Sequence, residues 1–140
     1  MSRFGRRLAF DYGDVRIGVA VCDPDGVLST PLTTLNSKDP KVLDHIAAIV
    51  DEYEPVKIYI GLPVNLSGSS SSSTVNAKEF GEKITARFDI SVAYIDERLS
   101  TVSANKKLLE SGMNSKQARA SIDQSAAVEI LEQGLRIDKK

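Results

Sequence analysis

Apolar residues occur along this chain in short runs that polar turns separate. Residues 8–10 form a continuous apolar run, which is typical of a strand buried on both faces of a sheet. A second run at 17–21 follows a tight polar turn, so the two runs predict an antiparallel pair of strands. Residues 27–35 predict a third strand, and Pro31 within this run favours a position at the sheet edge.

After these strands the apolar residues change to helical spacing. The pattern at 42–53 predicts a helix with Asp39 as its N-cap and Pro40 as its first residue. Pro55 lies just beyond the last apolar position and is expected to stop the helix. A helix is therefore expected directly after the three strands.

Strand and helix patterns alternate in the rest of the chain. Residues 56–61 and 90–95 predict strands, and Thr74 between them is expected to cap a second helix. Further helices are expected at 101–112, where a glycine closes the pattern, and from Ser115 onward. This order of elements predicts an α/β fold built on a mixed sheet with helical crossovers.

The composition indicates one globular domain. Of the 140 residues, 41% are apolar and 26% are charged, as in soluble globular proteins. No linker divides residues 1–140, and the serine run at 69–73 predicts a loop. The single cysteine, Cys22, excludes an internal disulfide and fits a reducing cytosol. The basic start at 1–7 precedes no signal-peptide core, and no run approaches the roughly 18 apolar residues of a membrane span. We therefore expect a cytoplasmic protein without membrane contact.

Three acidic residues occupy positions that favour ligand binding in such a fold. Asp11 ends the first strand, Glu97 lies just past the strand at 90–95, and Asp123 lies in the last helix. Ligands of α/β sheets collect outside the carboxyl ends of the strands, so these acids can converge there. A carboxylate cluster requires cations, and hard oxygen ligands favour Mg²⁺ or Mn²⁺. Two such ions would activate a water and stabilise the leaving oxygen of a phosphodiester.

Each of these acids also has an ordinary structural explanation. Asp11 can be a turn residue before Gly13, and Asp123 can be a solvated acid on a helix surface. The charged triplet at 96–98 can form the first turn of a helix, where acids interact favourably with the helix dipole. That explanation leaves Arg98 without a role, and the conjunction of the three acids favours the metal site.

Four motifs are similar, in order and spacing, to those of a known family. They lie at residues 8–23, 61–65 (Gly-Leu-Pro-Val-Asn), 96–101 (Asp-Glu-Arg-Leu-Ser-Thr) and 122–127 (Ile-Asp-Gln-Ser-Ala-Ala). With them, almost the whole chain resembles the YqgF (also RuvX) family of bacterial nucleases, which have a ribonuclease-H-like, RuvC-like fold. The resemblance implies a metal-dependent nuclease that acts in maturation of the 5′ end of pre-16S rRNA, in resolution of Holliday junctions, or in both.

The resemblance also implies roles for individual residues. Asp11, Glu97 and Asp123 would be the catalytic, metal-binding acids, with Asp96 as a candidate helper. The residues that would line the site are Arg16, Gly61, Pro63, Asn65, Arg98 and Thr101. Two departures from the family pattern are visible. Cys22 stands where the family often has serine, and the serine run replaces a more varied loop, which leaves the role of that loop open.

The charge of the chain is polarised although its sum is only −1. Five basic residues and one acid lie at 98–119, and Lys116 and Arg119 among them are candidate substrate contacts. Because the net charge gives no global attraction, binding of a structured RNA precursor or a branched DNA must depend on this local patch. The ordinary alternative is a solvated helix face. Tyr12, next to Asp11, can stack on a base or pack in the core.

Two other functions are compatible with the sequence. The first strand pair also resembles the phosphate-binding hairpin of actin-like ATPases and sugar kinases, but those proteins close two such domains over a nucleotide. The other alternative is a non-enzymatic nucleic-acid- or ribosome-associated protein with a degenerate site, against which the retention of three acids argues. For a nuclease, trimming RNA requires only a monomer, whereas resolving a junction requires two sites and favours a homodimer.

Overall fold

The computed structural model describes the backbone of residues 4–62, 72–97 and 116–139, and their side chains except those of 72–73 and 116–123. The strands are β1 (Arg7–Tyr12), β2 (Arg16–Cys22), β3 (Ser29–Asn36), β4 (Lys57–Leu62) and β5 (Ser91–Asp96). The helices are α1 (Val42–Tyr53), α2 (Ser72–Arg87) and α4 (Lys116–Asp138). The predicted α/β fold with a mixed sheet is confirmed.

β1 lies at the centre of a five-stranded sheet with the order β3-β2-β1-β4-β5. β1 and β3 both pair antiparallel with β2, whereas β4 pairs parallel with β1 and β5. β3 lies at the edge, as Pro31 predicts. It begins at Ser29 rather than at Val27, because the Asp23 carboxylate accepts the backbone N–H groups of Val27 (2.7 Å) and Leu28 (3.1 Å) and holds both in the preceding turn.

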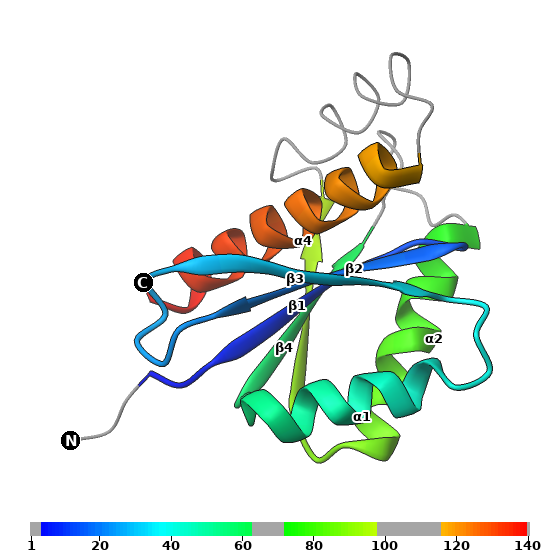
Figure 1. The fold of residues 1–140 in the computed structure, drawn as a ribbon. Helices are drawn as coiled ribbons and strands as arrows, with labels where there is room; N and C mark the ends of the chain where they lie inside the picture. Colours follow the sequence, from blue (N-terminus) through cyan, green and yellow to red (C-terminus); the bar gives the residue numbers. More distant parts are fainter. Residues whose placement is uncertain (1–3, 63–71, 98–115, 140) are drawn as a thin grey trace.

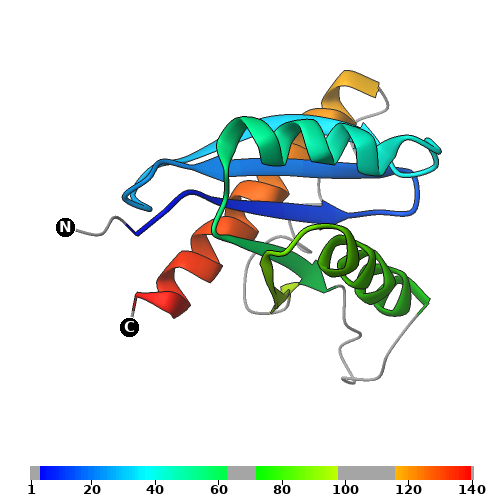
Figure 2. The same ribbon diagram turned by 90° about the horizontal axis from the view of Figure 1, so that it is seen from below.

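Helices cover both faces of this sheet (Figures 1 and 2). α1 and α2 lie on one face, and α4 crosses the other. Leu8 and Phe10 of β1 pack in the cluster that includes Ile46 of α1 and Ile84 of α2, whereas Ala9 packs in the cluster of α4. The continuous apolar run at 8–10 therefore reflects a strand that is covered on both faces.

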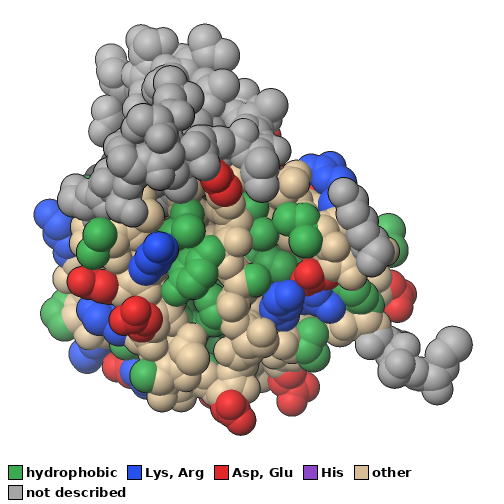
Figure 3. Space-filling model, turned by 180° about the vertical axis from the view of Figure 1, so that it is seen from behind, with side chains coloured by type: hydrophobic (Ala, Val, Ile, Leu, Met, Phe, Trp, Pro, Cys, Tyr) green, Lys and Arg blue, Asp and Glu red, His purple; other side chains and the backbone are tan. Residues whose placement is uncertain are grey.

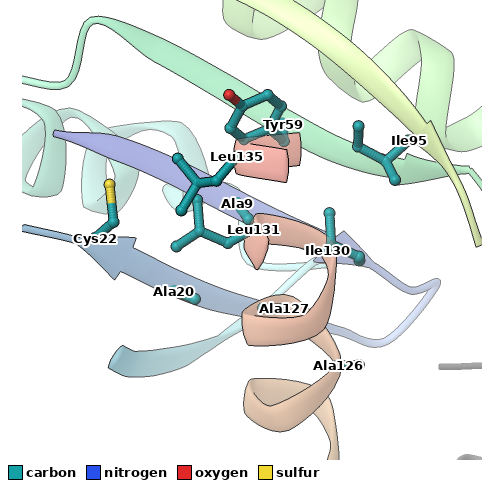
Figure 4. Packing of buried hydrophobic residues seen from close by; sticks show 10 residues of the cluster. All are labelled: Ala9, Ala20, Cys22, Tyr59, Ile95, Ala126, Ala127, Ile130, Leu131 and Leu135. Atoms are coloured by element: carbon teal, nitrogen blue, oxygen red, sulfur yellow. The ribbon is translucent and has the colours of Figure 1, made fainter. Parts of the chain in front are cut away.

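The carboxyl-terminal half of α4 packs very closely on the sheet. Figure 4 shows Ile130, Leu131 and Leu135 directed toward the strands. A Cβ atom on Gly134 would lie only 2.6 Å from the Tyr59 ring of β4, so the glycine allows the helix backbone to approach that ring. The helix therefore has little freedom to shift across the sheet.

A polar network fixes the last turn of α4 to the amino ends of β1 and β4. Oδ2 of Asp138 accepts hydrogen bonds from Arg7 Nη1 (2.7 Å), Lys57 Nζ (2.7 Å) and the Tyr59 hydroxyl (2.6 Å). Burial, together with the hydrogen bond to Asp138, raises the pKa of Tyr59 to about 12. Burial alone would raise the pKa of Asp138, but the hydrogen bonds from Lys57 and Tyr59 outweigh it and lower that pKa.

The start of α1 differs from the prediction. The helix begins at Val42 with Lys41 as N-cap, so Asp39 is not the cap and Pro40 is not the first residue. Oδ1 of Asp39 instead accepts the backbone N–H of Lys41 (2.9 Å), and its Oδ2 pairs with His45 (3.1 Å). Asp39 therefore stabilises the turn that leads into the helix.

The start of α2 also differs. This helix begins at Ser72, so Thr74 lies inside it and is buried rather than acting as the cap. The predicted helix at 101–112 and residues 69–71 of the serine run lie outside the described residues. The other two residues of the run predicted as a loop, Ser72 and Ser73, instead form the start of α2. Of the helices in the described ranges, none is long and apolar enough to cross a membrane.

Candidate metal centre

Asp11 lies near the carboxyl end of the central strand and is only 2% exposed. Since side chains alternate along a strand and Ala9 packs against α4, Asp11 lies on the α4 face of the sheet. Its partner in β2 is Gly18, and the register between β1 and β4 brings Gly61 next to it on the other side. With a glycine on each neighbouring strand, no Cβ atom occupies the space beside the Asp11 carboxylate.

The carboxylate of Glu97 lies over Gly61. Glu97 directly follows β5 and is 4% exposed. A Cβ atom on Gly61 would lie 3.1 Å from Oε1 of Glu97 and 2.5 Å from Cδ1 of Ile130 in α4. Gly61 therefore leaves the space that Glu97 occupies between the sheet and the helix. The structure thus brings two of the three predicted acids, Asp11 and Glu97, to the same face of the sheet around Gly61.

A hydrogen bond places the amino-terminal half of α4 over the same row of the sheet. Nε2 of Gln124 donates to Oγ1 of Thr34 in β3 (3.0 Å). Thr34 pairs with Gly18, which in turn pairs with Asp11. The sequence did not reveal this contact, because its two residues lie 90 positions apart and no local pattern links them.

The residues of α4 that lie over this row are small. Ala126 and Ala127 are buried against the sheet. Asp123 lies within α4, three and four residues before these alanines, so its backbone position is on the helical face that packs on the sheet. The Asp123 side chain lies outside the described residues, and the described side chains include no group of three His, Cys, Asp or Glu residues that could hold a metal ion.

The structure places two further predicted residues. Arg16 is half-buried at the start of β2. Its neighbour Ile17 faces α1 and α2, and because side chains alternate along a strand, Arg16 lies on the opposite face, which is the face of Asp11. Asp96, the candidate helper, is half-buried at the end of β5. Because side chains alternate along a strand, Asp96 lies on the face opposite to that of Ile95 and so points away from Glu97. Pro63, Asn65, Arg98 and Thr101 lie outside the described residues, and for Lys116 and Arg119 only the backbone, within α4, is described.

The face of the molecule drawn in Figure 3 carries side chains of mixed charge. In Figure 3, apolar side chains gather at the centre of the face, and acidic and basic side chains alternate around it. The predicted basic segment at 98–119 lies outside the described side chains. Tyr12 packs in the core, with its ring centroid 4.9 Å from that of Phe80.

The residues present fit a divalent cation. Two buried carboxylates on one face of the sheet are costly unless positive charge compensates them. The donors are all oxygen atoms, which is the ligand set that Mg²⁺ and Mn²⁺ prefer. The arrangement can therefore bind a divalent cation at the carboxyl ends of β1 and β5.

The five-stranded mixed sheet with helices on both faces has the ribonuclease-H-like, RuvC-like fold. The structure is similar to that of Thermus thermophilus RuvC in complex with a Holliday junction substrate, with a TM-score of 0.59, 13% identity and 96% of each chain covered. A second RuvC structure from this organism gives a TM-score of 0.53 at 14% identity, again over 96% of each chain. Identities this low establish the shared fold alone.

The sequence comparisons identify the family. The RuvX family, described as "Holliday junction resolvase", matches residues 5–137. A Streptomyces avermitilis protein described as "Putative pre-16S rRNA nuclease" is 43% identical over 139 residues, which cover 98% of this chain and 89% of that protein. A Mycobacterium ulcerans protein with the same description is 47% identical over 130 residues, which cover 91% of this chain and 76% of that protein. The chain belongs to the RuvX family and is a nuclease by class.

Proposed function

We propose that this protein is a metal-dependent nuclease that hydrolyses phosphodiester bonds with Asp11, Glu97 and Asp123 as its catalytic acids. One observation carries the proposal: two almost fully buried carboxylates, from the ends of β1 and β5, flank Gly61 beneath α4. The position of Asp123 on the face of α4 that packs on the sheet supports its role as the third acid.

In this proposal the three carboxylates hold Mg²⁺ or Mn²⁺. Two bound ions would activate a water for attack and stabilise the oxygen that leaves the phosphorus. Asp11 is held on a strand that is buried on both faces, and α4 is fixed at its far end by Asp138. Rigid elements of this kind keep the acids at a constant separation, on which the reaction depends.

Six residues are proposed to bind the substrate phosphates. They are Arg16, Asn65, Arg98, Thr101, Lys116 and Arg119. Lys116 and Arg119 precede Asp123 by seven and four residues in α4, a spacing that repeats on one helical face. Replacing both by Gln is expected to weaken nucleic-acid binding at low salt and to reduce the salt dependence by about one unit of slope per lost contact. A loss of affinity that is independent of salt would contradict a phosphate role.

The proposed substrate is the 5′ end of a pre-16S rRNA, a four-way DNA junction, or both. The description of the Streptomyces avermitilis and Mycobacterium ulcerans relatives supports the RNA, and the description of the family supports the junction. Trimming an RNA requires one active site, which a monomer can supply, whereas two symmetric cuts in a junction require two sites and favour a homodimer. The proposal places this activity in the cytoplasm.

The test is a cleavage assay with two labelled substrates in Mg²⁺ or Mn²⁺. One is a four-way DNA junction, and the other is an RNA that carries the 5′ leader of the small-subunit ribosomal precursor. Asp11→Asn serves as the control for contaminating nucleases, and Asp14→Asn, in the exposed turn after β1, serves as the matched charge control. We expect cleavage of at least one substrate by the wild-type protein and Asp14→Asn, and none by Asp11→Asn.

Two outcomes would support other functions. Binding of both substrates without cleavage would favour a non-enzymatic nucleic-acid- or ribosome-associated protein. Tight ATP binding without cleavage would favour the actin-like or sugar-kinase-like alternative.

Equal cleavage by the wild-type protein and Asp11→Asn would remove Asp11 from the mechanism.

A further inference from the structure

In the described sheet β3 pairs only with β2, so it forms one edge (Figure 1). It is the longest strand of the sheet, with 8 residues at 29–36, and none of these residues is charged. Exposed edge strands commonly carry charged side chains, because an uncharged edge pairs readily with a strand of another chain. The outer edge of β3 is therefore a surface suited to strand pairing.

The backbone hydrogen bonds show which residues of β3 direct their polar groups outward. At one end of the strand the N–H of Ser37 donates to the carbonyl of Val15 (2.9 Å). At the other end the N–H of Asp23 donates to the carbonyl of Leu28 (3.1 Å). Hydrogen-bonded and non-hydrogen-bonded pairs alternate along an antiparallel ladder, so these two bonds fix the alternation in each half of β3. The residues whose backbone groups point away from β2 are Ser29, Pro31, Thr34 and Asn36.

A β-bulge gives these outward residues a symmetric spacing. The register of β3 on β2 shifts between the partners of Val19 and Ala20, which widens the step in the middle of the outward series at 29, 31, 34 and 36. The series is therefore symmetric about residues 32–33. An antiparallel second copy of β3, related by a twofold axis at that point, would place Asn36 opposite Ser29 of the partner. The N–H of Asn36 can then donate to the carbonyl of the partner's Ser29.

Apolar side chains beside β3 would be covered by such a partner. Val27 and Leu28, directly before the strand, are 78% and 66% exposed. A groove of about 220 Å³ lies between the middle of β3 and α1. Its lining residues are Leu32, Thr33, Ala48, Ile49, Glu52 and Tyr53. Because residues 32 and 33 lie at the centre of the symmetric series, the groove would lie at the twofold axis, where the β3 strand of the partner covers it.

The exposed charges beyond the two ends of β3 are opposite in sign. Asp25 lies before the amino end of the strand, and Lys38 lies after its carboxyl end. Asp39, next to Lys38, already pairs with His45 (3.1 Å). An antiparallel copy of β3 brings Asp25 near Lys38 of the partner, whereas a parallel copy would bring like charges together. The charges therefore favour a second copy of this chain in the antiparallel orientation.

We propose that β3 binds a second copy of this chain by antiparallel pairing about a twofold axis at residues 32–33, which joins the two sheets into one. The axis of such a pair is perpendicular to the sheet, so the α4 faces of both copies lie on the same side. The two β1 strands that carry Asp11 are then separated by five interstrand spacings, about 24 Å. Two symmetric sites on one face suit two cuts in a four-way junction. This use of the dimer rests on the proposed nuclease function, whereas the dimer itself does not.

Sedimentation velocity in EDTA tests the dimer without a metal or a substrate. We expect the wild-type protein to change from the mass of one chain to that of two as its concentration rises from about 1 to about 300 μM. Thr30 is exposed, and the pairing places it opposite Leu35 of the partner, so Thr30→Lys should weaken the dimer at least about tenfold. Thr85→Lys, at an exposed position in α2, is the matched control and should dimerise as the wild type does. A monomeric wild-type protein, or equal dimerisation of Thr30→Lys, would overturn the proposal.

Charge reversal tests the antiparallel orientation. Asp25→Lys or Lys38→Asp alone brings like charges together at both ends of the interface and should weaken the dimer about fivefold at low salt. The double variant exchanges the two charges and should recover the wild-type affinity. If the double variant is as weak as the single ones, the antiparallel arrangement is wrong. If the wild-type protein cleaves but stays monomeric, the nuclease function stands and the β3 proposal fails. A dimer without cleavage would have the opposite meaning.

Discussion

Gly61→Ala is the substitution that best separates the function of the acids from the stability of the fold. The new Cβ atom would lie 3.1 Å from Oε1 of Glu97 and 2.5 Å from Cδ1 of Ile130. Unstrained contacts between such atoms are about 3.5–4.0 Å. The Glu97 carboxylate must therefore move by a few tenths of an ångström, and the terminal methyl group of Ile130 must move further.

The structure allows both effects to be estimated. The methyl group of Ile130 is at the flexible end of a side chain, so the cost is at the low end of overpacking, about 1 kcal/mol of unfolding free energy. A misplacement of about 1 Å in an active site can reduce the rate by about 10²-fold. A displacement of a few tenths of an ångström at Glu97 is therefore expected to lower kcat by about tenfold.

Gly134→Ala is the matched control, because it adds the same atom at the other end of the interface between α4 and the sheet. Its Cβ atom would lie 2.6 Å from the Tyr59 ring, whose hydroxyl is held by Arg7 and Asp138. The ring cannot rotate away without breaking that network, so overpacking is expected to exceed the gain in helix propensity by about 1–2 kcal/mol.

Urea denaturation and single-turnover cleavage at saturating Mg²⁺ measure the two quantities for each variant. We expect Gly61→Ala to lose more activity than stability, and Gly134→Ala to lose more stability than activity. The reasoning is refuted if Gly61→Ala cleaves at the wild-type rate while its stability falls. That result would mean that Glu97 can move without affecting the reaction.

Three further changes test the contacts of α4. Tyr59→Phe removes the hydroxyl between Arg7 and Asp138 and should cost about 1–2 kcal/mol in urea denaturation. Folding raises the pKa of Tyr59 from 10.0 to about 12, so the hydroxyl contributes fully to the free energy of unfolding below about pH 10, and this contribution is lost as the pH rises toward 12. The stability of Tyr59→Phe should not show this loss at alkaline pH. Asp138→Asn leaves Arg7 and Lys57 charged and partly buried and should cost about 2–4 kcal/mol at neutral pH. Because folding lowers the pKa of the Asp138 carboxyl, this difference should begin to shrink as the pH falls below about 4, where the unfolded chain is protonated first, and should be lost as the pH falls through the lowered pKa of the folded protein. Gln124→Leu should lower kcat with little change in KM, and an unchanged kcat would show that the bond to Thr34 does not position the helix for catalysis.

The local pattern of the sequence was sufficient to predict most of the sheet. The apolar runs at 8–10 and 17–21 lie in β1 and β2, and Pro31 correctly indicated an edge strand. Such predictions succeed because burial on one or both faces leaves a direct pattern in the residues of a strand. Helix starts were less accurate, since Asp39 and Thr74 have the chemistry of N-caps but are used in a turn and inside a helix.

The arrangement of the site required the fold as well as the motifs. The sequence predicted that Asp11 and Glu97 lie at strand ends, and the structure places both on the α4 face beside Gly61. It could not predict that Gln124 bonds Thr34, or that Asp138 links the two strands at the opposite end of α4. Those contacts join residues far apart in the chain and depend on the angle at which the helix crosses the sheet.

The central claim is that Asp11, Glu97 and Asp123 together hold the metal. Calorimetric titration with Mn²⁺ tests it most directly, using the wild-type protein, Asp11→Asn, Glu97→Gln, Asp123→Asn and the control Asp14→Asn. The account predicts that each of the three acid variants binds Mn²⁺ at least about tenfold more weakly than the wild-type protein, whereas Asp14→Asn binds it equally well. Wild-type affinity in Asp11→Asn and Glu97→Gln would contradict the account, because the two buried carboxylates around Gly61 would then not be ligands.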